Sequence, residues 1–297
     1  MKLSIILLNF NGLGDTLTCL DSIRKLKLDS TGIQIIVIDN FSSDGSQEAL
    51  PEVKDIVFIQ NQDNLGYAGG NNVGIKYALR RDADAVLILN NDTIVDPKLV
   101  LNLVAAFKQG DLISPKIYFA KGFEFHKSRY KQRESGKVVW FAGGEIDWEN
   151  VIGKHMGVDE VDRGQFAKRK EITFATGACM MVKREIFEKV GLFDEKYFLY
   201  LEDMDFCVRI KSAGFRIIFE PEAIVWHKNA SSSGGSGSPL QDYFITRNRL
   251  FFAFKHASIR TKFAVFRQIL SQLKKPIKRK AFFDFLTFNF GKGSYVK

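Results

Sequence analysis

The sequence predicts an α/β protein with a mostly parallel sheet flanked by helices. Short apolar runs alternate with segments of helical periodicity through the first 118 residues, and each run ends in polar residues. Alternation of this kind is typical of βαβ units. The chain has 297 residues, of which 45% are hydrophobic and 26% charged, so it is long and apolar enough for a large core. Every apolar run is shorter than the roughly 20 residues that a membrane-spanning helix needs.

Eight elements are expected in this first part of the chain, in alternating order. Strands are predicted at residues 3–8, 33–38, 56–59 and 85–89, and helices at residues 15–26, 46–50, 71–81 and 97–108. Asn and Pro at the last two helix starts are typical helix openings. Ligands of such sheets bind beyond the carboxyl ends of the strands. Because Asn9, Asp39, Gln60 and Asn90 follow the four strands, we expect a polar cleft at that edge.

The pattern changes after residue 118. Residues 121–170 are rich in Gly, basic and aromatic residues, and we expect an excursion from the sheet with a hairpin through residues 137–141 and 145–148. Strands are then predicted at residues 172–174, 179–182, 216–219 and 223–226, with helices from 184 and over 203–213. Residues 231–239 have the low complexity of a linker or a mobile loop. We therefore divide the chain into a main domain, residues 1–240, and a helical extension, residues 241–297.

The net charge of +9 is concentrated in this extension. Between Tyr243 and Phe283 there are eleven Lys and Arg residues and no Asp or Glu. Apolar residues at three- to four-residue spacing in the same segment predict an amphipathic helix; they are Ile259, Phe263, Phe266, Leu270 and Leu273. A basic amphipathic helix is typical of interfacial membrane binding, with packing onto the main domain as the alternative. We expect an anionic membrane surface, and no nucleic acid, as its partner.

The cysteine pattern bears on the compartment. The three cysteines are widely spaced and form no CxxC motif, which favours neither a disulfide framework nor a zinc ribbon; they are Cys19, Cys179 and Cys207. A reducing compartment fits this pattern best. Together with the basic extension, it predicts a cytoplasmic protein that is peripheral to the inner face of the cell membrane.

Several motifs follow one another in a characteristic order. They are SIILLNFN at residues 4–11, VIDN at 37–40, SDGS at 43–46, NLGYAGGNN at 64–72, NND at 90–92, YLEDMD at 200–205 and WH at 226–227. In this order and spacing the chain resembles the family 2 glycosyltransferases of the GT-A fold, especially the rhamnosyltransferase-like members, from about residue 3 to about residue 250. The resemblance implies an inverting transfer of a sugar, possibly rhamnose, from a dTDP- or UDP-sugar to a hydroxyl of a glycan. Cell-surface polysaccharide synthesis is the expected process, and membrane docking by the basic extension would suit a lipid-linked acceptor.

The resemblance places the donor site at the strand ends. Asp39 would hydrogen-bond the nucleoside, although a cap of its own turn is the structural alternative. Residues 64–72 contain three glycines, so their backbone can approach a phosphate or ribose closely. Arg247 belongs to an Arg-Asn pair that resembles one in the family and is a candidate diphosphate partner. The candidate donor-binding residues are Asn9, Asn11, Asp39, Asn64, Gly66, Asn71, Asn72, Asn91 and Arg247.

The same resemblance implies a divalent cation, Mn²⁺ or Mg²⁺. Asn90-Asn91-Asp92 stands in the position of the family's DxD motif, so Asp92 would be a metal ligand. Asn90 replaces the first carboxylate, and one charge fewer should weaken the site, because these cations prefer hard oxygen ligands. His227 would be a further contact to the metal or the diphosphate.

Two acidic residues at the start of a predicted helix are the catalytic candidates. By resemblance, Asp203 is the general base that takes the proton from the acceptor hydroxyl, and Glu202 contacts the acceptor. Acids in the first turn of a helix also stabilise its dipole, which is the alternative. Asp205 and Arg209 form an (i, i+4) pair and are predicted to support the helix.

Two other functions remain open at this point. Gly12 and Gly14 follow the first strand and Asp39 ends the second, as in a dinucleotide-binding fingerprint, so an NAD-type oxidoreductase is the first alternative. Leu17 replaces the third glycine, however, and Asp15 would repel a pyrophosphate at the helix start. The second alternative is a non-catalytic, membrane-associated adaptor, which Asn90 suggests.

Overall fold

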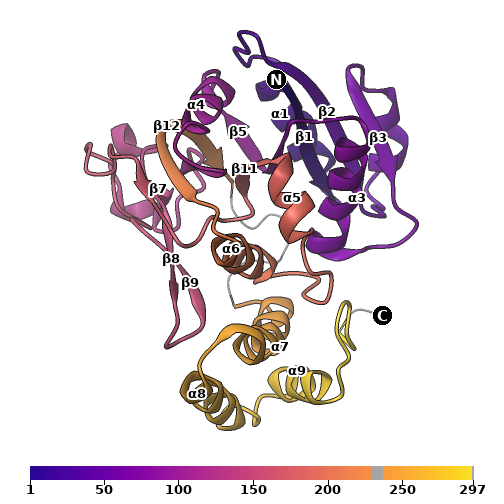
Figure 1. Ribbon diagram of the computed structural model, residues 1–297, viewed down its shortest axis with the longest axis vertical. Helices are drawn as coiled ribbons and strands as arrows, with labels where there is room; N and C mark the ends of the chain where they lie inside the picture. The colour runs from indigo at the N-terminus through magenta and orange to yellow at the C-terminus, as the bar shows by residue number, and fades with distance from the viewer. Residues whose placement is uncertain (229–236, 296–297) are drawn as a thin grey trace.

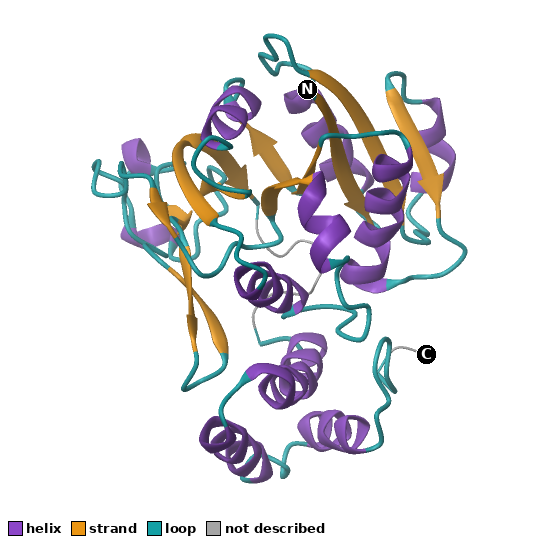
Figure 2. Ribbon diagram, in the orientation of Figure 1, coloured by secondary structure: helices purple, strands orange, loops and turns teal. Residues whose placement is uncertain are grey.

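A single large sheet, flanked by helices, organises the computed structural model, which describes residues 1–228 and 237–295 (Figure 1, Figure 2). Its main strand order is β10-β12-β6-β11-β4-β1-β2-β3, with β5 paired to β12 and β7 paired to β6. The strands of this sheet are β1 (Lys2–Asn9), β2 (Gly32–Asp39), β3 (Ile56–Gln60), β4 (Ala85–Asn90), β5 (Thr93–Val95), β6 (Leu112–Phe119), β7 (Val139–Phe141), β10 (Lys170–Glu171), β11 (Cys179–Lys183) and β12 (Ile217–His227). The expected α/β fold is confirmed.

Helices cover both the sheet and its carboxyl edge. They are α1 (Leu13–Ile23), α2 (Ser46–Ala49), α3 (Gly66–Arg80), α4 (Leu99–Ala106), α5 (Arg184–Val190), α6 (Glu202–Ser212), α7 (Pro239–His256), α8 (Ile259–Leu270) and α9 (Pro276–Leu286). Short 3₁₀ turns occupy Leu50–Glu52, Lys127–Arg129 and Gln132–Glu134. No helix within the described residues is long and apolar enough to cross a membrane.

The register of the parallel strands produces the polar edge. Strand β1 is parallel to β2 and to β4, and Asn9 lies directly opposite Asp39 while Leu8 lies opposite Asn90. The strands are buried along most of their length, so their polar side chains are confined to the ends. The predicted gathering of Asn9, Asp39 and Asn90 at one edge of the sheet is therefore present.

Helix α3 begins five residues earlier than expected, because its glycines pack against the sheet. A β-carbon on Gly70 or Gly74 would lie within 3 Å of side-chain atoms of Leu8 and Ile6 on β1. Glycine is a poor helix former, so intrinsic propensity points away from a helix at residues 66–70. Close approach to β1 needs these small residues, and tertiary packing overrides propensity here.

The excursion after β6 pairs differently from our expectation. The predicted hairpin through residues 137–141 and 145–148 is wrong: β7 pairs with β6, while β8 (Gly144–Asp147) pairs with β9 (Ile152–His155) in a separate sheet. Gly143, with φ of +94°, separates β7 from β8. The Asp147 carboxylate accepts hydrogen bonds from the backbone N–H groups of Glu149 and Asn150, which forms the turn that connects β8 to β9.

Smaller differences concern the second half of the sheet. The two strands predicted at residues 216–219 and 223–226 form one strand, β12, with an irregularity between Glu220 and Ile224. Residues 172–174 contribute only an isolated bridge between Phe174 and Gly144. Residues 231–236 of the predicted linker lie outside the described residues, and Pro239 opens α7.

We expect Gly74→Val to lower the free energy of unfolding by about 1–3 kcal/mol, because the added carbons meet the buried Ile6 side chain. Urea denaturation measures this. The matched control is Gly14→Val, since Gly14 is exposed on α1 and has no atom within 4 Å of the β-carbon position. Equal loss of stability in both variants would contradict close packing of α3 on β1.

Candidate functional site

A cleft of about 820 Å³ lies at the carboxyl edge of the sheet. Its lining includes Asn90, Asp92, Glu202, Asp203 and His227. Four of these five are the predicted metal-binding and catalytic residues, and Asp92 is more than 100 positions away from the other three in the sequence. The structure brings them together at one cavity.

Asp92 and His227 form the first pair in the cleft. His227 lies opposite Thr93 in the pairing of β12 with β5, which puts its ring beside Asp92. Asp92 Oδ1 and His227 Nε2 are 3.0 Å apart, and both side chains are buried. Burial alone would raise the pKa of Asp92, but His227 and Lys228 outweigh it and hold this pKa below its usual value. Asp92 is therefore ionised.

Apart from their contact with each other, the polar atoms of Asp92 and His227 that could bind a metal have few partners. Within the described part of the chain, Asp92 Oδ1 and both ring nitrogens of His227 make no hydrogen bond of regular geometry. A carboxylate oxygen and an imidazole nitrogen, both facing a polar cleft, are suitable ligands for Mn²⁺ and similar cations. No cluster of three or more His, Cys, Asp or Glu residues that could hold a metal occurs among residues 1–228 and 237–295. The pair therefore fits a cation that is also held by a substrate.

Glu202 and Asp203 form the second pair, at the start of α6. Asp203 is partly exposed to the cleft, and its two oxygens accept hydrogen bonds from the backbone N–H groups of Gly177 (2.9 Å) and Met204 (2.8 Å). Burial raises the pKa of Asp203. Burial and the adjacent Asp203 raise the pKa of Glu202 well above its usual value. These two groups therefore have the environment of proton-transfer residues.

The residues expected to bind the donor lie beside the cleft in a hydrogen-bonded network. Asn9 Nδ2 donates to Asp39 Oδ1 (2.8 Å) and Asn91 Nδ2 donates to Thr16 Oγ1 (2.9 Å). The second oxygen of Asp39 accepts from the backbone N–H of Ser42, so Asp39 does cap its own turn. A role for these side chains in donor binding remains a prediction.

The other donor candidates also make local contacts. Asn11 has a φ of +52° and accepts from the Ser43 backbone N–H, while Asn64 accepts from the Gly66 N–H. Asn71 donates to the carbonyl of Tyr67 on its own helix. Asn72 exchanges hydrogen bonds with the backbone of Phe193 and so ties α3 to the segment before α6.

Arg247 has a different place from the one we expected. Its guanidinium is fully buried and donates to the carbonyls of Tyr197 (3.0 Å) and Gly291 (2.8 Å), and it does not line the cleft. Asn248 beside it donates from one amide nitrogen to the carbonyls of Tyr197, Leu199 and Tyr200. The Arg-Asn pair thus holds the loop that leads into α6.

That loop has a strained backbone. Phe198, Tyr200 and Leu201 have φ values of +64°, +69° and +71°. Non-glycine residues adopt the left-handed region at a cost, and such residues cluster at functional sites. The carbonyl groups bound by Arg247 and Asn248 therefore fix an otherwise unfavourable conformation immediately before Glu202.

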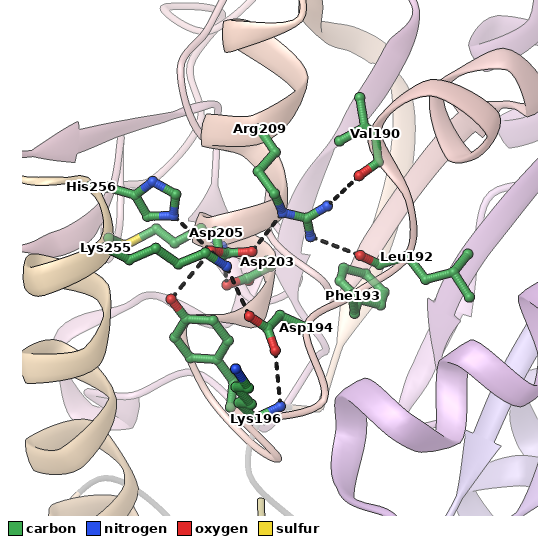
Figure 3. A network of polar contacts seen from close by, with 12 residues as sticks. Val190, Leu192, Phe193, Asp194, Lys196, Asp203, Asp205, Arg209, Lys255 and His256 are labelled. Atoms are coloured by element: carbon green, nitrogen blue, oxygen red, sulfur yellow. Dashed lines mark hydrogen bonds and ion pairs between the residues drawn. The ribbon is translucent and has the colours of Figure 1, made fainter. Parts of the chain in front are cut away.

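Asp205 is the centre of a buried ionic network that joins α6 to α7 (Figure 3). Its carboxylate lies 2.7 Å from Arg209 on α6 and 2.7 Å from each of Lys255 and His256 on α7. Burial alone would raise the pKa of Asp205, but the hydrogen bond from His256 and the charges of Arg209 and Lys255 hold it well below its usual range. The pair with Arg209 was predicted from sequence. The partners on α7 were missed, because no sequence pattern indicates a contact between Asp205 and residues that lie 50 positions later in the chain.

An aromatic wall of the cleft was also missed. Phe125, Trp140, His155 and Phe174 line it, and the Trp140 ring lies 4.6 Å from the His227 ring. Burial lowers the pKa of His155 to about 4, so its imidazole is neutral near pH 7. The abundance of aromatic residues at 121–170 was visible in the sequence, but their common orientation depends on the β8–β9 pairing.

Comparison with known sequences gives a family and several relatives. The model of the family described as Glycosyl transferase family 2 matches residues 4–191. The chain is 27% identical over 219 residues to a low-salt glycan biosynthesis hexosyltransferase of Haloferax volcanii, which covers 72% of this chain and 63% of that protein. It is 26% identical over 214 residues to the N-acetylglucosaminyl-diphospho-decaprenol L-rhamnosyltransferase of Mycobacterium tuberculosis, with 68% of each chain covered.

Among solved structures, the fold is similar to that of GalNAc-T7 determined with UDP, GalNAc and Mn²⁺. The TM-score is 0.62 at 17% sequence identity, and the likeness covers 89% of this chain and 53% of the other. At this identity the likeness shows the fold alone. The chain spans less than two thirds of the length of both the Haloferax protein and GalNAc-T7.

We expect Asp205→Asn to lower the free energy of unfolding at pH 7 by about 3 kcal/mol, since it removes the buried carboxylate that pairs with Arg209 and Lys255. Because the pKa of Asp205 is depressed in the folded protein, its contribution is present above the unfolded-state pKa and is lost at lower pH. The gap between wild type and variant should thus narrow below about pH 4.

Urea denaturation at a series of pH values measures this gap. Asp21→Asn is the matched control, because Asp21 forms an exposed (i, i+3) pair with Arg24 and should change stability little. If the gap does not narrow at low pH, or if both variants lose the same stability, the charge of Asp205 does not hold α7 against α6.

Proposed function

Because the chain belongs to glycosyl transferase family 2, we propose that it moves a sugar from a nucleoside diphosphate donor to a hydroxyl group of a glycan. One observation carries the proposal: the Asp92–His227 pair and the Glu202–Asp203 pair line one cleft at the carboxyl edge of the sheet. The first pair suits the charged diphosphate and the second suits proton transfer. The two halves of a sugar-transfer reaction therefore have residues of the required chemistry in a shared cavity.

The proposed reaction is a single displacement that inverts the anomeric carbon. The acceptor oxygen forms a bond to that carbon as the bond to the donor's phosphate oxygen breaks, and Asp203 takes the acceptor's proton. Hydrogen bonds from Gly177 and Met204 orient the Asp203 carboxylate. The raised pKa of Glu202 favours its protonated form, which can donate a hydrogen bond to the acceptor.

We propose that Asp92 and His227 hold a divalent cation, Mn²⁺ or Mg²⁺, together with the donor's diphosphate. A bound cation supplies charge neutralisation for the diphosphate as it departs. The ionised carboxylate of Asp92 and the ring nitrogens of His227, which make no hydrogen bond of regular geometry, fit this role. Two protein ligands suffice because such cations commonly keep water and substrate phosphates in their coordination shell.

The finer identity of the substrates is also a proposal. Rhamnose from dTDP-rhamnose is our first choice of donor, with UDP-sugars as the alternative. A mycobacterial relative is named as a rhamnosyltransferase that acts on a diphospho-decaprenol-linked sugar, which supports a lipid-linked acceptor in cell-surface polysaccharide synthesis. An acceptor of this kind favours a peripheral position at the inner membrane face, as the basic extension predicts.

Asp203→Asn is expected to lower kcat/KM for sugar transfer by about 100-fold or more, since the variant cannot take the proton. In the wild type, kcat/KM should rise with pH through the elevated pKa of Asp203. Release of nucleoside diphosphate in the presence of acceptor measures the rate. Glu48→Gln is the control, an exposed acid in the first turn of α2. Full activity of Asp203→Asn would contradict the assignment of Asp203 as the base, whereas a wild type without transfer activity would favour the adaptor.

Thermal unfolding with UDP, dTDP, GDP or NADH, each with and without Mn²⁺, tests donor and metal binding. We expect a Mn²⁺-dependent stabilisation by a pyrimidine diphosphate, of about 3 kcal/mol at 100 times the dissociation constant. Asp92→Asn and His227→Gln should each reduce it, whereas Asp203→Asn should retain it. Stabilisation by NADH alone would favour the oxidoreductase instead.

A further inference from the structure

The positive charge of residues 243–283 is distributed unequally between the interior and the surface. Four of the eleven basic side chains are engaged within the protein: Arg247, Arg249, Lys255 and Lys278. The other seven belong to α8, α9 and the turn between them, and they have no ion pair or side-chain hydrogen bond with another described residue. They are Arg260, Lys262, Arg267, Lys274, Lys275, Arg279 and Lys280.

Helix α8 carries an apolar stripe that faces away from the protein. Ile259, Phe263 and Leu270 are 65%, 69% and 44% exposed. Positions four and eleven residues apart lie within about 40° of one another around a helix, so the three side chains share one face. Val265 and Ile269 are buried on the other side. Packing onto the rest of the chain therefore explains one apolar face of α8 and leaves a second one uncovered.

Helix α9 and the segment after it extend this apolar surface. Phe283 and Leu286 are exposed one turn apart on α9, and Phe288 is exposed just beyond it. Leu286 and Phe288 also border a hollow of about 490 Å³, whose other lining residues are Lys196, Phe251, Phe254, Lys255, Phe285 and Phe290. The basic residues Arg279 and Lys280 are exposed on the same helix, α9, as Phe283 and Leu286.

We propose that this surface, formed by α8, α9 and the segment to Phe288, is a docking face for an anionic lipid bilayer. Its apolar side chains can enter the headgroup and acyl boundary while the seven basic side chains remain at the level of the headgroups. Both features are needed for such a surface, and the exposed apolar side chains would be unfavourable in water alone.

Charge argues against two other occupants of the face. A second copy of this chain, docked through the same surface, would bring seven unpaired positive charges against seven. A nucleic acid would match the charge but would leave the large apolar stripe of α8 in contact with phosphates. An anionic bilayer matches both the charge and the apolar area.

The docking face lies next to the cleft, and here the inference rests on the proposed function. Arg249 lines the cleft and donates to the carbonyl of Asn150, in the β8–β9 turn, and to Gln268 on α8. Figure 1 shows α8 and α9 at one end of the molecule, on the side of α7 away from the sheet. A bilayer on this face would present a lipid-linked acceptor near the aromatic wall of the cleft.

The test uses the full chain and vesicles of phosphatidylcholine, with and without phosphatidylglycerol, in a flotation assay at low and high salt. Wild-type protein should bind only the anionic vesicles and should release at high salt. Arg260→Glu combined with Arg267→Glu should weaken binding about 30-fold, since each basic residue near the surface contributes about fivefold. Phe263→Ser should weaken it about fivefold without any change of charge.

Matched controls separate the face from overall charge and hydrophobicity. Lys25→Glu combined with Lys27→Glu makes the same charge change near α1, and Leu17→Ser removes an exposed apolar side chain from α1; α1 lies at the other end of the molecule (Figure 1). Both controls should bind vesicles like the wild type. Three results would overturn the proposal: the lysine double variant loses as much vesicle binding as the arginine double variant, Phe263→Ser binds like the wild type, or the wild type does not bind anionic vesicles.

Because no sugar donor or acceptor is present in the flotation assay, its result is independent of the transferase proposal. An unchanged urea denaturation midpoint in each α8 variant shows that the main fold is intact, whether or not the cleft binds a sugar donor. Equally tight binding of a DNA duplex that does not depend on Phe263 would identify a nucleic-acid surface and would also contradict the proposal.

Discussion

The buried carboxylate of Asp205 links the packing of α6 and α7 to the position of the cleft residues on α6. A buried charge must be paired and hydrogen-bonded, and α6 alone supplies only Arg209. The remaining partners, Lys255 and His256, come from α7, so the charge of Asp205 is fully paired only when α7 packs against α6. Asp203 precedes Asp205 by two residues on the same helix, and its place in the cleft therefore depends on this interhelical pair.

Much of the fold follows from local sequence patterns. Alternating apolar runs and helices predicted β1 to β4 and the helices between them, because the strands are apolar, β1, β2 and β4 are largely buried, and polar turn residues bound each strand. The residues that line the cleft, Asp92, Glu202, Asp203 and His227, were predicted through a family resemblance. Their shared location then follows from strand register and from the start of α6, which the order of the motifs anticipates.

Long-range partners explain what the sequence did not reveal. Arg247 has the charge of a phosphate ligand, and only the folded chain shows that its guanidinium is taken up by the carbonyls of the strained loop before α6. The β8–β9 hairpin is present in place of the expected pairing. Asp147 forms the turn that connects its strands, and the apolar alternation of the flanking residues did not reveal this local interaction. The α8 stripe was visible as a periodic pattern, but its outward orientation depends on which face meets α7.

The contacts of Arg247 and Asn248 also determine where the chain can be divided for engineering. Composition places the boundary at residue 240, yet α7 supplies the groups that hold the loop before Glu202 and the ion pairs of Asp205. A module built to use the proposed membrane-docking face would therefore begin after His256, at α8, and a chimera with another enzyme should retain α7 from the parent catalytic domain.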